Sequence, residues 1–194
     1  MTTDETNPYR LRTGAWPPGT KVPAHVEKRV IVLPGRAYPI EAPLLFWTGS
    51  GLIEDGWFVQ SVSWHRPPLD RGFVCAALQS ALGEAPRADR TLVVAKSLGT
   101  HAAPVAAQLR LPAVWLTPVL TDTAVGEALS SYPAPQLTIG GSADPLWPVD
   151  APHPSGAVMY VEGADHGMEV GGVRESNAVH MDVVDRVRAF AGSL

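Results

Sequence analysis

At its centre the sequence reads Thr91-Leu-Val-Val-Ala-Lys-Ser97-Leu-Gly99-Thr100, an apolar run followed at once by a serine and a glycine. The run predicts a strand, and the residues after it predict the start of a helix. Ala95 and Gly99 are both small, as a serine on a sharp strand-to-helix turn requires, because a bulky side chain would collide with the next strand or with the helix. The pattern therefore predicts a nucleophile elbow at Ser97, with a plain strand-to-helix joint as the alternative.

Two later segments follow the same plan, each an apolar run that ends in a loop with one titratable residue. The run 136–140 leads to Asp144, and the run 157–162 leads to His166. Strand ends of a parallel sheet meet at one edge, so we expect both side chains to reach Ser97. A neutral imidazole takes the serine proton during attack, and a carboxylate orients the ring. The sequence therefore predicts a catalytic triad of Ser97, His166 and Asp144.

With its nucleophile, acid and base in this chain order, the sequence resembles the α/β-hydrolases over roughly residues 30–190. A fourth supporting element is the strand at 29–33, which closes in Pro34-Gly35 where that superfamily often has His-Gly. The resemblance implies an oxyanion hole made by the backbone N–H groups of Arg36 and Leu98, with Ala37 open as the alternative donor in the first loop. It also implies a serine hydrolase of carboxylesterase or thioesterase type that works through an acyl-serine intermediate.

Short apolar runs alternate with helix-length segments, which predicts an α/β fold. We expect a single-domain, three-layer α/β/α arrangement with a mostly parallel sheet of about six strands, a minimal α/β-hydrolase fold. The strands are expected at 29–33, 57–63, 91–96, 112–117, 136–140 and 157–162, and the helices at 43–53, 69–82, 98–109, 122–131 and 173–190. Residues 1–28 are expected to form an N-terminal arm, with an edge strand as an equal alternative, and residues 29–194 the hydrolase domain.

Only residues 117–135 separate the fourth and fifth expected strands, which leaves space for one helix. We therefore expect an open cleft without a lid, suited to a modest acyl group. Residues that follow strand ends are expected to form its substrate-binding wall, and for the tryptophans core or loop packing is the alternative. These residues are Trp64, Leu146, Trp147 and Met168.

Other polar residues offer rival assignments. His65 also ends a strand but has no acid placed to orient it as Asp144 can orient His166. Asp122 is a rival acid, and its alternative role is that of a helix N-cap. Lys96, beside the serine, could attract an anionic substrate, or could pack or point to solvent.

Composition excludes several classes of protein. The 194 residues include 45% hydrophobic ones, and the net charge is −4 without a basic stripe, so we expect no nucleic-acid partner. No apolar run suits a membrane span, and we expect a cytoplasmic protein, a monomer or a homodimer, that binds a small-molecule acyl substrate. Cys75 is the single cysteine, and no ligand pattern predicts a metal or a cofactor. A non-catalytic binding protein of the same fold and an acyltransferase that uses the same site remain the alternatives.

Overall fold

Seven strands form one sheet in the computed structural model, which describes residues 9–194. Their order across the sheet is β1-β3-β2-β4-β5-β6-β7, and every neighbouring pair is parallel except β1 with β3. The turn at Ser97 therefore follows the central strand. The strands are β1 (Arg12–Ala15), β2 (His25–Leu33), β3 (Phe58–Ser63), β4 (Arg87–Lys96), β5 (Ala113–Leu116), β6 (Gln136–Gly141) and β7 (Ala157–Val161).

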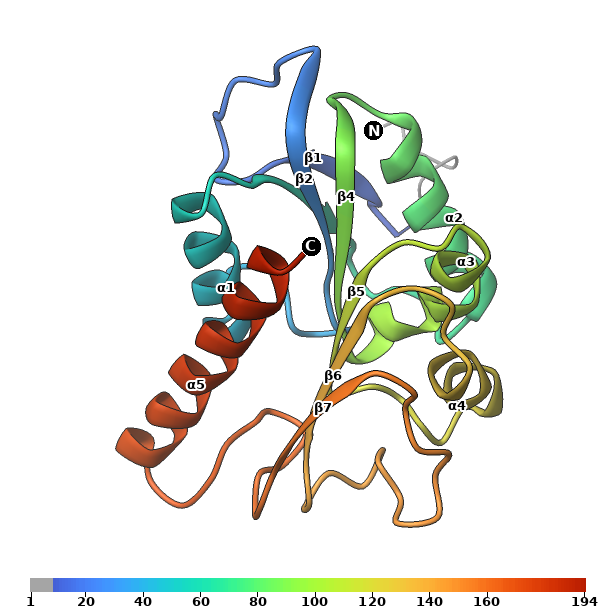
Figure 1. Cartoon of the computed structure of the whole chain (residues 1–194), viewed down its shortest axis with the longest axis vertical. Coiled ribbons are helices and arrows are strands. Elements are labelled where there is room, and N and C mark those ends of the chain that lie inside the picture. The colour runs from blue at the N-terminus through green and yellow to red at the C-terminus, as the bar shows by residue number, and fades with distance from the viewer. Residues whose placement is uncertain (1–8) are drawn as a thin grey trace, which may run out of the picture.

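Helices cover both faces of the sheet (Figure 1). On one face α1 (Pro43–Glu54) packs against α5 (Val173–Gly192). On the other face lie α2 (Arg71–Gly83), the 3₁₀ helix η1 (Ser97–Ala102), α3 (Ala103–Gln108) and α4 (Thr123–Ser130). The connection from β5 to β6 contains α4 as its single helix, so no long insertion stands over the strand ends there.

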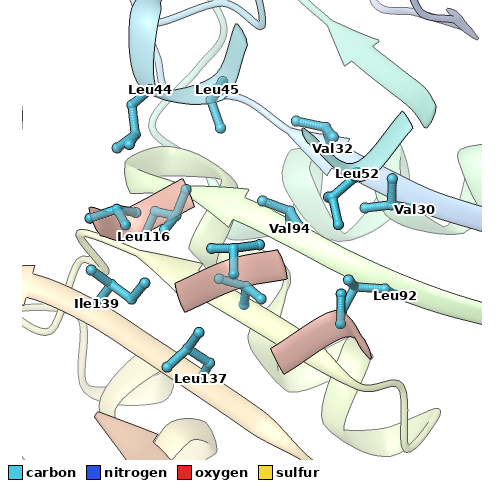
Figure 2. Close-up of a cluster of buried hydrophobic side chains, with 14 of the residues drawn as sticks. Val30, Val32, Leu44, Leu45, Leu52, Leu92, Val94, Leu116, Leu137 and Ile139 are labelled. Atoms are coloured by element: carbon cyan, nitrogen blue, oxygen red, sulfur yellow. The ribbon is translucent and has the colours of Figure 1, made fainter. Parts of the chain in front are cut away.

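The two helical layers explain why the central strands are apolar at consecutive positions. Val30 and Val94 face α1 and α5, in the cluster that Figure 2 shows with Leu52. The intervening Ile31 and Val93 pack on the opposite side, under α2 and α3. A strand buried on both faces has no polar side to alternate with, and so it is uniformly hydrophobic.

The predicted α/β architecture is confirmed, and each of the six expected strands has a counterpart. The helix expected at 98–109 is divided, because η1 precedes α3 and Pro104 opens the α-helical part. In the predicted N-terminal arm, residues 1–28, the structure has β1 and the beginning of β2, while residues 1–8 lie outside the described part. The edge-strand alternative therefore applies to the described residues. No helix within 9–194 has the length and hydropathy to cross a bilayer.

Candidate active site

Ser97 occupies a strained turn at the end of β4. Its φ of +51° lies in the left-handed region, which non-glycine residues rarely adopt and which is often found at functional sites. Gly99 is required by close packing, since a Cβ atom there would stand 2.5 Å from the carbonyl oxygen of Leu33. The neighbouring Ala95 is fully buried in the sheet. This geometry is the sharp strand-to-helix turn that the sequence predicted.

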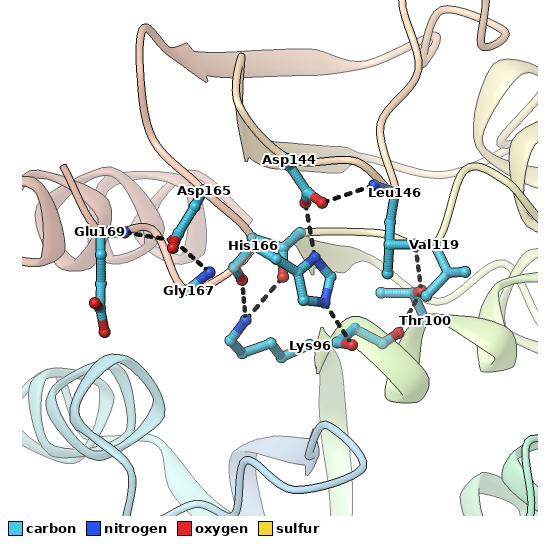
Figure 3. A network of polar contacts seen from close by, with 11 residues as sticks. Lys96, Thr100, Val119, Asp144, Leu146, Asp165, His166, Gly167 and Glu169 are labelled. Atoms are coloured by element: carbon cyan, nitrogen blue, oxygen red, sulfur yellow. Dashed lines mark hydrogen bonds and ion pairs between the residues drawn. The ribbon is translucent and has the colours of Figure 1, made fainter.

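The structure brings Ser97, His166 and Asp144 into one hydrogen-bonded line. Figure 3 shows His166 and Asp144. His166 Nδ1 lies 2.8 Å from Asp144 Oδ2, and His166 Nε2 lies 2.8 Å from Ser97 Oγ. The Asp144 side chain is fully buried, and its Oδ1 accepts the backbone N–H of Leu146 at 2.9 Å. An ionised carboxylate only accepts hydrogen bonds, so Nδ1 carries the proton and Nε2 is left free to accept the serine O–H.

The loops that carry Asp144 and His166 are joined by their backbones. The N–H of Ser142 donates to Val161 at 3.0 Å, and the N–H of Ala143 donates to Ala164 at 3.0 Å. A Cβ at Gly141 would overlap the Ala164 carbonyl, so only glycine permits this approach. The two loops therefore hold the carboxylate and the imidazole in one unit.

The loop that carries His166 is also folded tightly on itself; we call it the His166 loop. The Asp165 carboxylate accepts the N–H groups of Gly167 at 2.7 Å and Glu169 at 3.0 Å. His180, from α5, has its Nε2 3.2 Å from the Gly167 carbonyl oxygen. These contacts fix the backbone on both sides of His166, which reduces the freedom of its ring.

Lys96 is buried, which agrees with the packing alternative, and it contacts the loop that carries His166. Its side chain is buried, and Nζ donates to Thr117 Oγ1 and to the backbone carbonyl of His166, both at 2.8 Å (Figure 3). The ammonium also lies 4.6 Å from the ring centroid of Tyr38. Desolvation lowers the pKa of Lys96 to about 8, against the opposing attraction of Asp144 and Asp165. Lys96 therefore binds the backbone of the His166 loop from the protein interior and does not face solvent.

The loop after β2 lies against Ser97. A Cβ at Gly35 would stand 3.5 Å from that of Ser97, and the Gly99 N–H donates to Pro34 at 3.1 Å. Leu98, in the first turn of η1, belongs to the positions whose N–H groups have no acceptor inside a helix. Of the two predicted oxyanion donors, Leu98 directly follows Ser97, and Arg36 directly follows Gly35. Both backbone N–H groups therefore belong to segments that meet at Ser97.

A cavity of about 420 Å³ opens between this loop and the end of β3. Trp64 lines it and donates its indole N–H to the Gly35 carbonyl at 3.0 Å. The other three predicted wall residues do not line this cavity. Leu146 is half-buried beside Asp144, and Trp147 packs over Gly140, whose Cβ the indole ring excludes. Met168 is fully buried in the α1–α5 core, so its side chain presents no surface to a ligand, which corrects its placement on the wall.

The rival residues have other positions. Asp122 caps α4, since its carboxylate accepts the N–H groups of Ala124 and Val125, and it also lies 3.3 Å from His101 Nδ1. Burial lowers the pKa of His101. His65 is exposed at the rim of the cavity. Within residues 9–194, no group of three or more His, Cys, Asp or Glu side chains is arranged to hold a metal ion.

No protein-family profile and no curated protein matches the chain. Solved structures do. The esterase Pf2001 of Pyrococcus furiosus matches with a TM-score of 0.66 and 15% identity, over 87% of this chain and 83% of that one. XC6422 from Xanthomonas campestris, described as an α/β serine hydrolase without lid, gives a TM-score of 0.64 and 14% identity over 94% and 88% of the two chains. Est1E from Butyrivibrio proteoclasticus, solved with ferulic acid, gives a TM-score of 0.63 and 13% identity, over 91% of this chain and 95% of that one. With its parallel sheet in this strand order and its sharp turn after the central strand, the chain adopts the α/β-hydrolase fold.

Proposed function

We propose that this protein is a serine hydrolase that cleaves small carboxylic esters or thioesters. The observation that carries the proposal is the imidazole of His166, which lies 2.8 Å from both the Ser97 hydroxyl and the Asp144 carboxylate. A serine hydroxyl is a poor nucleophile at neutral pH and needs such a base within hydrogen-bond reach. The strained turn at Ser97 and the fold shared with esterases support the same reaction class.

In the first half of the reaction, His166 Nε2 takes the proton of Ser97 while Oγ bonds to the carbonyl carbon. The backbone N–H groups of Leu98 and Arg36 stabilise the oxygen that becomes negative, an effect worth about 3–4 kcal/mol per donor in other enzymes. The bond from carbon to the leaving oxygen or sulfur then breaks, and His166 returns the proton to that leaving group. Asp144 stabilises the transient imidazolium without taking a proton.

In the second half, water replaces the leaving group. His166 accepts one proton of the water, whose oxygen bonds to the acyl carbon of the acyl-serine. The proton passes to Ser97 Oγ as the ester bond breaks, which releases the carboxylic acid and restores the enzyme. The cavity of about 420 Å³ beside Gly35 suits a short or medium acyl group.

A fluorophosphonate probe, which modifies activated serines, tests the proposal. We expect labelling of the wild type and hydrolysis of 4-nitrophenyl butyrate, both lost in Ser97→Ala. Ser80→Ala serves as the control, because Ser80 is an exposed serine on α2. Equal labelling of wild type and Ser97→Ala would contradict the proposal. Product analysis with added alcohol distinguishes hydrolysis from acyl transfer.

A further inference from the structure

Positive side chains gather at the cavity beside the nucleophile. Arg36 and Arg66 line it, and no aspartate or glutamate does. This composition contrasts with the whole chain, in which 19 acidic residues outnumber 15 basic ones. A cavity lined by one sign of charge focuses its field on a ligand of the opposite sign.

The topology places the two arginines at equivalent positions. Arg36 is the third residue after β2, and Arg66 is the third residue after β3, which are parallel neighbours in the sheet. Their loops therefore begin side by side at the carboxyl ends of the two strands. The indole N–H of Trp64 donates to the Gly35 carbonyl and ties one loop to the other. β4 pairs with β2 on its other side, so Ser97 stands at the same edge.

Neither arginine is neutralised within the protein. Both residues are exposed, and no ion pair joins either guanidinium to a carboxylate of residues 9–194. The carboxylate of the site, Asp144, is buried and already accepts hydrogen bonds from His166 and Leu146. The guanidinium groups thus keep their planar sets of donors for a ligand, a geometry that matches carboxylate and phosphate oxygens.

We propose that the substrate carries a second, anionic oxygen group, a carboxylate or a phosphate, that Arg36 and Arg66 bind while Ser97 attacks the ester. This inference rests on the proposed hydrolase function and adds the class of substrate. The ester group reacts at Ser97, and the anionic group lies in the cavity between the β2 and β3 loops. Lys96 has no part in this recognition, because it is buried and engaged with Thr117 and His166.

Two esters that differ at one end of the acyl chain test the proposal. In 4-nitrophenyl hexanoate the chain ends in a methyl group, and in mono-4-nitrophenyl adipate it ends in a carboxylate. We expect the wild type to show a kcat/KM about tenfold higher for the adipate at low salt, and the preference to shrink as NaCl is added. Arg36→Gln and Arg66→Gln should each remove part of this ratio, and the double variant all of it.

Arg90→Gln is the matched control, because Arg90 is an exposed arginine on β4, six residues and about 20 Å before Lys96. It should leave the ratio of the two esters unchanged. Inhibition of adipate hydrolysis by inorganic phosphate and by acetate, compared at equal ionic strength, identifies the anionic group. Stronger inhibition by phosphate indicates a phosphate, stronger inhibition by acetate indicates a carboxylate, and either result supports the proposal. Ser97-dependent hydrolysis with no preference for the adipate, or a preference that survives in the double variant, would overturn this inference and leave the hydrolase function intact. If neither ester is hydrolysed, both fail.

Discussion

Replacing Lys96 by methionine tests whether a buried ammonium supports the His166 loop. In the folded protein, desolvation lowers the pKa of Lys96 from 10.5 to about 8. Between these values the unfolded chain binds a proton that the folded chain has released. The penalty of burying the charge is therefore complete below pH 8 and disappears as the pH rises towards 10.5, so the contribution of Lys96 to stability increases with pH.

The size of this effect follows from the shift. Each pKa unit corresponds to about 1.4 kcal/mol, so the full difference is about 3 kcal/mol, of which about 2 kcal/mol falls between pH 7 and pH 10. Methionine has a similar apolar stem and no proton to release. The free energy of unfolding of the wild type should therefore gain about 2 kcal/mol relative to Lys96→Met over this interval.

Urea unfolding at pH 7 and pH 10, followed by tryptophan fluorescence, measures this difference. Lys21→Met is the control, because Lys21 is exposed, and it should change with pH as the wild type does. The same variant series should show a lower kcat for Lys96→Met, since the His166 carbonyl loses the donor that holds it at 2.8 Å. Identical pH dependence of unfolding in the wild type and Lys96→Met would refute the reasoning.

Two further substitutions separate the acid from its rival. Asp144→Asn should lower kcat by about 10³- to 10⁴-fold in ester hydrolysis, because the wrong imidazole tautomer would face Ser97. Asp150→Asn, at an exposed position of the same loop, should not lower it. A loss below tenfold for Asp144→Asn would argue against this role. Asp122→Ala should cost about 1 kcal/mol through the lost cap of α4 and lower Tm by about 2–4 °C in calorimetry, with kcat unchanged. A fall in kcat comparable to that of Asp144→Asn would instead identify Asp122 as the acid.

The strand-to-loop pattern predicted the positions of the three central residues because strand order alone brings them together. Ser97, Asp144 and His166 each follow a parallel strand, and parallel strands deliver their ends to one edge. The same pattern predicted where helical segments connect the strands, but not that the segment at 98–109 is divided into η1 and α3. These features depend on local sequence and on rules of topology, which one sequence contains.

The side chains around the triad were harder to predict because loop paths decide them. Met168 and Trp147 follow strands as Trp64 does, yet tight turns direct the first two into packing contacts. Lys96 could have been recognised from the four apolar residues before it, since a strand covered on both faces also buries its next residue. Its partners, Thr117 and the His166 carbonyl, come from other loops and carry no local signal.

The sheet ends at β7, and the loop that follows this strand carries His166. β7 pairs on one side only, with β6, and its side chains are partly exposed. Such an edge strand detaches more easily than a strand at the centre of the sheet. The remaining strands would survive that detachment, and Ser97 would lose its contact with His166. On warming, we therefore expect ester hydrolysis to be lost at a lower temperature than the one at which tryptophan fluorescence shows unfolding. We also expect the amides of residues 157–161 to exchange for deuterium faster than those of β4.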